Sequence, residues 1–209
     1  MTYLFDFDGT LVDSMPIYID TMLQILKDYD IDYPADIVKI ITPLGMKGTA
    51  DYYIAMGVPL TEGEMIERMG RGMLEAYFTQ IPAKEDVIET LKALKDRGDS
   101  LNVLTASPHI TLDACLKRLG IYDWFDHVWS CDDFATTKAN PEIYKQAAAR
   151  IGVPVSDVLF LDDNLNAIRT AQAAGMQVCG VHDVSSEEYE PEMLQVAGRY
   201  IRNLKELLT

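Results

Sequence analysis

The chain of 209 residues carries 33 acidic and 18 basic side chains, a formal net charge of −15, and 48% of its residues are hydrophobic. This length and apolar fraction suffice for one domain, or for a core domain with an insertion. The negative charge argues against nucleic acid or an anionic membrane as a partner, because both would repel the protein. An anionic substrate would therefore need a local positive site.

The first ten residues combine a strand with two acids. Thr2–Phe5 reads as a short buried strand, and Asp6 and Asp8 follow it at a spacing that places both side chains on one face. Two carboxylates so close together persist if a cation lies between them or one holds a proton, and oxygen ligands favour Mg²⁺. A solvated Asp-Gly turn is the simpler alternative. A calcium loop does not fit, because Leu11 and Ile17 occupy its glycine and glutamate positions.

Residues 14–82 carry apolar side chains at helical spacing. The expected helices are Ile17–Tyr29, Thr49–Met56 and Met65–Phe78. Strand-like runs are scarce in this part of the chain, so we expect an all-helical module inserted after the first strand. Its methionines are most simply explained as core packing.

From Ile81 and Pro82 onward, helices and strands alternate. The expected strands are Ser100–Leu104, His127–Ser130, Val158–Leu161 and Gln177–Val181; the expected helices are Val87–Arg97, Ile110–Leu119, Pro141–Arg150, Asn164–Ala174 and Leu204–Leu208. Alternating apolar strands and helices predict an α/β fold with a doubly wound parallel sheet.

Polar residues follow several of these strands, where ligands bind in such sheets. After Asp6 and Asp8 come Thr105 and Ser107, then Lys138 in the loop before a helix, and finally Asp162 and Asp163. Each has a simpler explanation when taken alone. Thr105 could cap the next helix, Lys138 could be a surface charge, and Asp162 and Asp163 could be acids at a helix N-terminus.

Taken in order, four stretches resemble the haloacid dehalogenase superfamily of hydrolases. They are Asp6–Ser14 (DFDGTLVDS), Leu104–Ser107 (LTAS), Lys138–Tyr144 (KANPEIY) and Phe160–Asn164 (FLDDN) with the trailing Ala173–Met176. The helical insertion resembles the cap of the phosphoglycolate phosphatase and beta-phosphoglucomutase branch. The resemblance implies a Rossmann-like catalytic core of residues 1–13 and 83–209 and a helical cap domain of residues 14–82.

The resemblance also implies catalytic roles. Asp6 would be the nucleophile that forms an aspartyl-phosphate, and Asp8 the general acid and then the base that activates water. Mg²⁺ would be held by a carboxylate oxygen of Asp6, the backbone carbonyl of Asp8, and Asp163. Asp162 would be an outer or water-mediated ligand.

A second group of residues is implied to surround the phosphate. Thr105, the amide of Ala106 and the ammonium of Lys138 would hold the phosphate oxygens. The hydroxyl of Thr10 would support the nucleophile loop.

An acid at Asp8 indicates phosphoryl transfer to or from an alcohol. We therefore expect a Mg²⁺-dependent phosphatase acting on a small phosphomonoester, with a sugar phosphomutase as the alternative. Mutases of this branch have a His ten residues beyond that acid, where this chain has Tyr18. A binding protein that keeps the fold without catalysis is the remaining hypothesis. The expected partner is a small phosphorylated metabolite, and the protein is expected to be a monomer or homodimer.

Substrate choice is expected to lie in the cap. Ile41–Thr49, rich in Gly and Pro, is predicted to be a specificity loop, with Lys47 as a substrate contact or, equally, a solvated lysine. Hinges for opening and closing the cap are expected near Asp13–Pro16 and Ile81–Lys84.

Compartment is inferred from three observations. No leader-like segment precedes the first strand, and no apolar stretch reaches the roughly 18 residues of a membrane span. Cys115, Cys131 and Cys179 lack metal-ligand spacing, and we expect them to be reduced. We therefore expect a cytoplasmic protein.

Overall fold

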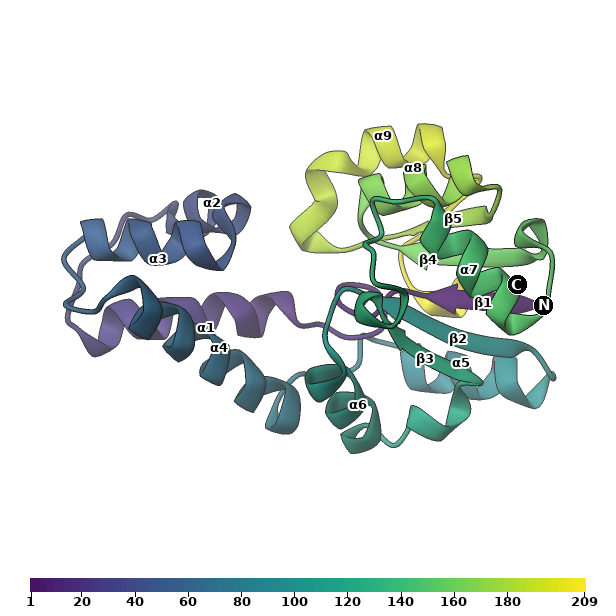
Figure 1. Cartoon of the computed structure of the whole chain (residues 1–209), viewed down its shortest axis with the longest axis horizontal. Helices are drawn as coiled ribbons and strands as arrows, with labels where there is room; N and C mark the ends of the chain where they lie inside the picture. Colours follow the sequence, from purple (N-terminus) through teal and green to yellow (C-terminus); the bar gives the residue numbers. More distant parts are fainter. The chain divides into compact units, whose positions relative to one another are not determined.

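The computed structural model describes residues 1–209, except for the side chain of Pro43. The chain forms two compact units (Figure 1). The core unit comprises Met1–Ser14 and Ile81–Thr209, and the helical unit comprises Met15–Gln80. In the part of the chain that is described, no helix has the length and apolar character needed to cross a membrane.

The core unit is built on a six-stranded parallel sheet with the order β3-β2-β1-β4-β5-β6. Its strands are β1 (Thr2–Phe5), β2 (Ser100–Thr105), β3 (His127–Ser130), β4 (Val158–Asp162), β5 (Gln177–Val181) and β6 (Arg199–Ile201). The predicted α/β fold with a doubly wound parallel sheet is confirmed.

The central strand β1 lies where the strand order reverses. The chain proceeds from β1 to β2 and β3 on one side, and then to β4, β5 and β6 on the other. Phe5 pairs with Val103 of β2 and with Leu161 of β4, so three strands end side by side. In open α/β sheets this reversal creates the crevice in which ligands bind.

Helices cover both faces of the sheet; α8 and α9 lie above the strands in Figure 1, and α5 and α6 below them. The core-unit helices are α5 (Val87–Asp96), α6 (His109–Arg118), α7 (Glu142–Ile151), α8 (Leu165–Ala174) and α9 (Glu190–Val196). One buried cluster joins Leu4 and Phe160 of the sheet to Tyr144 of α7, Ile168 of α8 and Met193 of α9.

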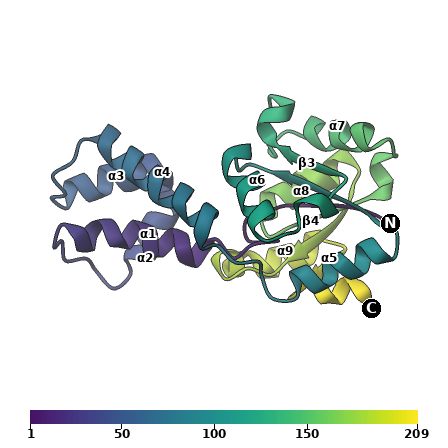
Figure 2. The same ribbon diagram turned by 90° about the horizontal axis from the view of Figure 1, so that it is seen from below.

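The helical unit consists of α1 (Met15–Asp28), α2 (Ile37–Ile41), α3 (Gly45–Ala55) and α4 (Glu62–Thr79), with a 3-10 turn at Thr42–Leu44. In the view of Figure 2, α1 and α4 run side by side, and they are in contact. Met22 of α1 and Met65 and Met69 of α4 are fully buried, as core packing requires. Thr61 begins α4 with a capping box, in which its side chain and that of Glu64 each accept from the other's backbone N–H.

The prediction that Ile41–Thr49 forms a loop is wrong, whereas its role in substrate choice stays a prediction. The short helix α2, the 3-10 turn and α3, which already begins at Gly45, follow one another directly. Gly45 has φ +63 and allows the sharp change of direction between the turn and α3. Gly and Pro here mark the junction of short helices rather than an extended loop.

Sequence patterns also missed short elements near the C-terminus. Strand β6 has three residues and α9 seven, both too short for a periodic signal. The predicted helix Leu204–Leu208 is a 3-10 helix, η6, which packs against α5.

Candidate active site

Three carboxylates meet where β1 and β4 end. Asp6 follows β1, Asp162 is the last residue of β4, and Asp163 comes next. One ligand oxygen from each lies within 4.8 Å of the others. The side chain of Asn164 accepts from two backbone amides and so begins α8, which fixes the turn that contains Asp163.

Lys138 brings one positive charge to these acids. Its Nζ lies 2.5 Å from Oδ1 of Asp6 and 2.8 Å from Oδ2 of Asp162, and its side chain is 15% exposed. The Tyr144 hydroxyl donates to the Lys138 carbonyl at 3.0 Å, which ties the loop to α7. Charge-assisted hydrogen bonds of this kind are short and strong in a buried site.

The site remains short of positive charge. Burial raises the pKa of Asp6 to about 8; Lys138 opposes this rise, whereas Asp162 and Asp8 add to it. Burial, and then the charges of Asp162 and Asp6, hold the pKa of Asp163 well above its usual value. Burial acts to lower the pKa of Lys138, but Asp162 and Asp6 outweigh it and raise that pKa. Three acids facing one ammonium leave room for a further cation, and an all-oxygen donor set fits Mg²⁺.

The three acids differ in the hydrogen bonds that their carboxylate oxygens already accept. Asp162 accepts from Lys138 with Oδ2 and from the Asn164 amide with Oδ1, at 2.7 Å. Among the described residues, no hydrogen-bond donor reaches the carboxylate of Asp163. A cation at this site would therefore find Asp163 and the second oxygen of Asp6 more available than Asp162.

Asp8 faces β2 rather than the three-acid cluster. The Ser107 hydroxyl donates to Oδ2 of Asp8 at 2.5 Å. Thr105 at the end of β2 is buried, and its hydroxyl accepts from the Ser107 amide at 3.0 Å. It does not cap α6, whose N-cap residue is Pro108. Ala106 lies between them and is exposed.

The loop after Asp8 packs closely against Asp163. A Cβ placed on Gly9 would lie 2.7 Å from Oδ1 of Asp163, and Gly9 has φ +78. The neighbouring Thr10 is fully buried, and its hydroxyl finds no partner in the described part of the chain. The predicted support of the nucleophile loop by this hydroxyl stays a prediction, and it does not take the form of a hydrogen bond here.

Lys47 lies in the helical unit, on the first turn of α3. Its Nζ pairs with Asp51 at 3.2 Å and with Glu62 at 2.9 Å, and the side chain is 65% exposed. Its role as a substrate contact stays a prediction.

For two groups near the site, the sequence predicted no catalytic or binding role. Ser107 follows β2 in the same turn as Thr105, so its place at a strand end was a usable signal. Lys84 bonds to the Gly9 carbonyl from 75 residues away, and nothing local in the sequence marks that contact.

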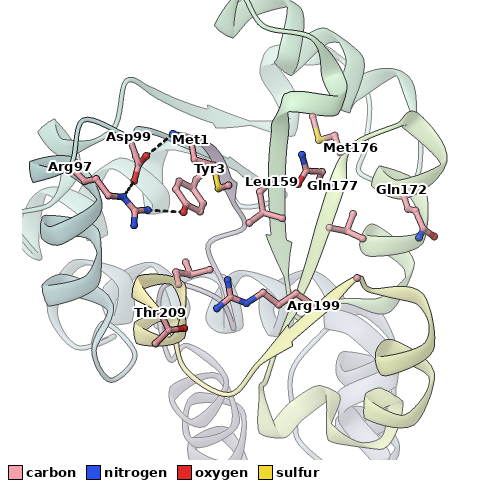
Figure 3. A pocket seen from close by; sticks show the side chains of 13 residues that line it. Met1, Tyr3, Arg97, Asp99, Leu159, Gln172, Met176, Gln177, Arg199 and Thr209 are labelled. Atoms are coloured by element: carbon pink, nitrogen blue, oxygen red, sulfur yellow. Dashed lines mark hydrogen bonds and ion pairs between the residues drawn. The ribbon is translucent and has the colours of Figure 1, made fainter.

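A large cavity lies at the other end of the sheet (Figure 3). Its volume is about 730 Å³, and its lining includes Tyr3, Leu159 and Val178 near the amino ends of β1, β4 and β5. Figure 3 also shows that Asp99 pairs with Arg97 and the N-terminal ammonium. This cavity is separate from the acid cluster.

Comparisons with known proteins agree with this geometry. The family model described as haloacid dehalogenase-like hydrolase matches residues 3–181. Pyrophosphatase PpaX from Bacillus pumilus is 30% identical over an alignment of 185 residues, which covers 86% of this chain and 82% of that protein.

Solved structures share the fold. A provisionally named beta-phosphoglucomutase from Thermotoga maritima has a TM-score of 0.87 at 21% identity, covering 99% of this chain and 96% of that one. The provisionally named hydrolase YfnB from Bacillus subtilis, solved with magnesium bound, has a TM-score of 0.80 at 18% identity, with coverage of 99% and 96%.

Proposed function

Because the chain belongs to the haloacid dehalogenase-like hydrolase family, we propose that it is a Mg²⁺-dependent phosphatase that hydrolyses a small phosphomonoester through an aspartyl-phosphate. The observation that carries the proposal is the group of three carboxylates and one ammonium where β1 and β4 end. Phosphoryl transfer depends chiefly on positive charge placed around the transferring group.

The two acids after β1 have distinct tasks in this proposal. A carboxylate oxygen of Asp6 forms a bond to phosphorus while the ester P–O bond breaks, and Asp8 gives a proton to the leaving alkoxide. Asp8 then takes a proton from water as that water attacks phosphorus, which releases phosphate and restores Asp6. The hydrogen bond from Ser107 supports this role because it orients the Asp8 carboxylate.

The remaining residues stabilise charge. Bound Mg²⁺ would be held by Asp6, the backbone carbonyl of Asp8 and Asp163, with Asp162 further out, and would act as a Lewis acid on the phosphoryl oxygens. The remaining phosphate oxygens are held by Lys138, Thr105 and the Ala106 amide. Lys138 bonds to Asp6 and Asp162 here, so it exchanges at least one of these bonds when phosphate arrives.

The direct test is phosphate release from p-nitrophenyl phosphate and from a panel of phosphorylated metabolites with Mg²⁺. We expect turnover by the wild type, and a loss of more than about a thousandfold in Asp6→Asn, because the nucleophile is gone. Asp96→Asn is the matched control, since Asp96 pairs with Lys92 on the exposed face of α5. Activity retained in Asp6→Asn would refute the aspartyl-phosphate route.

The same panel separates the alternatives. Pyrophosphate belongs in it because one relative is named a pyrophosphatase. Conversion of beta-glucose 1-phosphate to the 6-phosphate would favour a mutase, although Tyr18 stands where the mutases have His. No turnover on any phosphate would favour a binding protein.

Three free buried cysteines support a reducing, cytoplasmic location.

A further inference from the structure

Lys84 connects the loop after β1 to the end of β5. Its Nζ donates to the Gly9 carbonyl at 2.7 Å, to the His182 carbonyl at 2.6 Å and to Oδ2 of Asp183 at 2.9 Å. An ammonium has three N–H donors, so all of them are engaged within the protein. The side chain is 19% exposed and that of Asp183 only 6%. Lys84 therefore has no donor left for a substrate and acts through the groups that it holds.

The backbone of Lys84 holds the same loop a second time. Its amide donates to the Leu11 carbonyl at 3.0 Å, and the adjacent Ala83 forms an antiparallel bridge with Val12. The loop also closes on itself, because the Gly9 amide donates to the Val12 carbonyl at 2.9 Å. One residue thus fixes the loop at two points, through its backbone and through its side chain.

The groups that Lys84 holds lie on either side of Asp163. In the sheet order β4 lies between β1 and β5, so a bond from the loop after β1 to the end of β5 spans the end of β4. Gly9 contacts both partners: its carbonyl accepts from Lys84, and its Cα lies so close to Asp163 that a Cβ would reach Oδ1 at 2.7 Å. A shift of Gly9 would therefore change the position of the Asp163 carboxylate.

We propose that Lys84 is a positioning residue that holds the loops after β1 and β5 around Asp163, and thereby sets the geometry in which Asp6 and Asp163 bind Mg²⁺. This inference rests on the proposed function for its magnesium site. Placement of ligands to within a fraction of an ångström decides how well such sites bind and react.

The test compares Lys84→Met with Lys92→Met, which removes an exposed lysine paired with Asp96 on α5. Magnesium binding is measured by isothermal titration calorimetry with MgCl₂ alone, and turnover is measured across Mg²⁺ and substrate concentrations. We expect Mg²⁺ affinity to fall at least about tenfold in Lys84→Met, kcat to fall and recover partly at high Mg²⁺, and KM to stay within about threefold. Lys92→Met should match the wild type.

Asp183→Asn separates positioning from charge. It keeps both carbonyl acceptors of Lys84, so we expect Mg²⁺ affinity within about threefold of wild type. An equal loss in Asp183→Asn and Lys84→Met would assign the effect to the charge pair and overturn the positioning role. If Lys84→Met does not fold, as judged by circular dichroism, Lys84→Gln replaces it. Its shorter side chain has two donors in place of three, so we expect a smaller loss of Mg²⁺ affinity in the same direction, and wild-type affinity would overturn the inference.

Other outcomes are equally decisive. Wild-type affinity and kcat in Lys84→Met, within twofold, would overturn the inference, and so would a wild type that binds no Mg²⁺. A wild type that binds Mg²⁺ without hydrolysing any phosphate would refute only the phosphatase proposal, and the calorimetric comparison would still decide the role of Lys84.

Discussion

Gly9 illustrates how one residue determines the spacing of the site. Two separate facts favour glycine here: φ is +78, and the space that a Cβ would take lies 2.7 Å from Oδ1 of Asp163. The positive φ would cost an alanine backbone energy, and the short distance would bring its Cβ into contact with the Asp163 carboxylate. They can be separated experimentally, because Gly120 has φ +73 with nothing within 4 Å of its Cβ position.

We expect Gly9→Ala to lose both stability and magnesium binding. The left-handed backbone costs an alanine roughly 1–2 kcal/mol, which should appear equally in Gly120→Ala. Only in Gly9→Ala should the displaced Asp163 weaken Mg²⁺ binding by about tenfold or more, as measured by calorimetry, with denaturant unfolding reporting stability. Equal Mg²⁺ affinity in the two variants would contradict the contact argument.

At the scale of elements, α6 is joined to the segment after β3 through one histidine. His109, the first residue of α6, has its ring nitrogens 2.9 Å from Asp113 and 2.8 Å from Asp133. The hydrogen bond to Asp113 raises the pKa of His109, burial lowers it, and Asp133 raises it further, so that the pKa lies above its ordinary value. The protonated ring therefore connects two acids from different elements.

This shift predicts a pH-dependent contribution to stability. Because the folded pKa is above the unfolded value of about 6.5, the contribution is fully present below that pH and is lost as pH rises through the folded pKa. We expect His109→Gln to lower the free energy of unfolding more at pH 5.5 than at pH 8.5, by less than about 1 kcal/mol, since the ring is partly exposed.

Lys117→Met is the control for that measurement, because Lys117 also lies near Asp113, at 4.0 Å, but has no imidazole ring. Its effect in urea unfolding should be the same at both pH values. A pH-independent loss in His109→Gln would show that the charge of the ring does not contribute.

At the scale of the whole molecule, the net charge of −15 sets the background against which the site works. Excess negative charge repels itself in the folded state, and salt screens this repulsion. A cation at the acid cluster acts differently, because it binds particular oxygens rather than the average field. The effect of ionic strength on stability should therefore be separable from the effect of a bound cation.

We expect NaCl, raised from about 10 to 200 mM, to increase Tm in the wild type and in Asp163→Asn alike, by a few degrees at roughly 2–4 °C per kcal/mol. MgCl₂ at equal ionic strength should give the wild type an additional increase, because a ligand stabilises the state that binds it. Differential scanning fluorimetry measures both. The same additional increase in Asp163→Asn would place the Mg²⁺ elsewhere.

Much of this protein follows from local sequence. Apolar strands such as Val158–Asp162, helix signals such as Asn164 and Gly175, and the polar residues after each strand are all readable, because periodicity, caps and turns act over a few residues. The parallel order then brings strand ends to one edge, so the meeting of Asp6, Asp162 and Asp163 was foreseeable.

Only the tertiary structure decided which residues pair with one another at that edge of the sheet. Lys138 contacts Asp6 across 132 residues, and Lys84 contacts Gly9 across 75 and Asp183 across 99. Such contacts depend on the distances between packed loops, which leave no periodic trace in the chain. The sequence by itself therefore determined which groups reach the edge of the sheet, whereas the packing of distant segments decided which oxygens each ammonium holds.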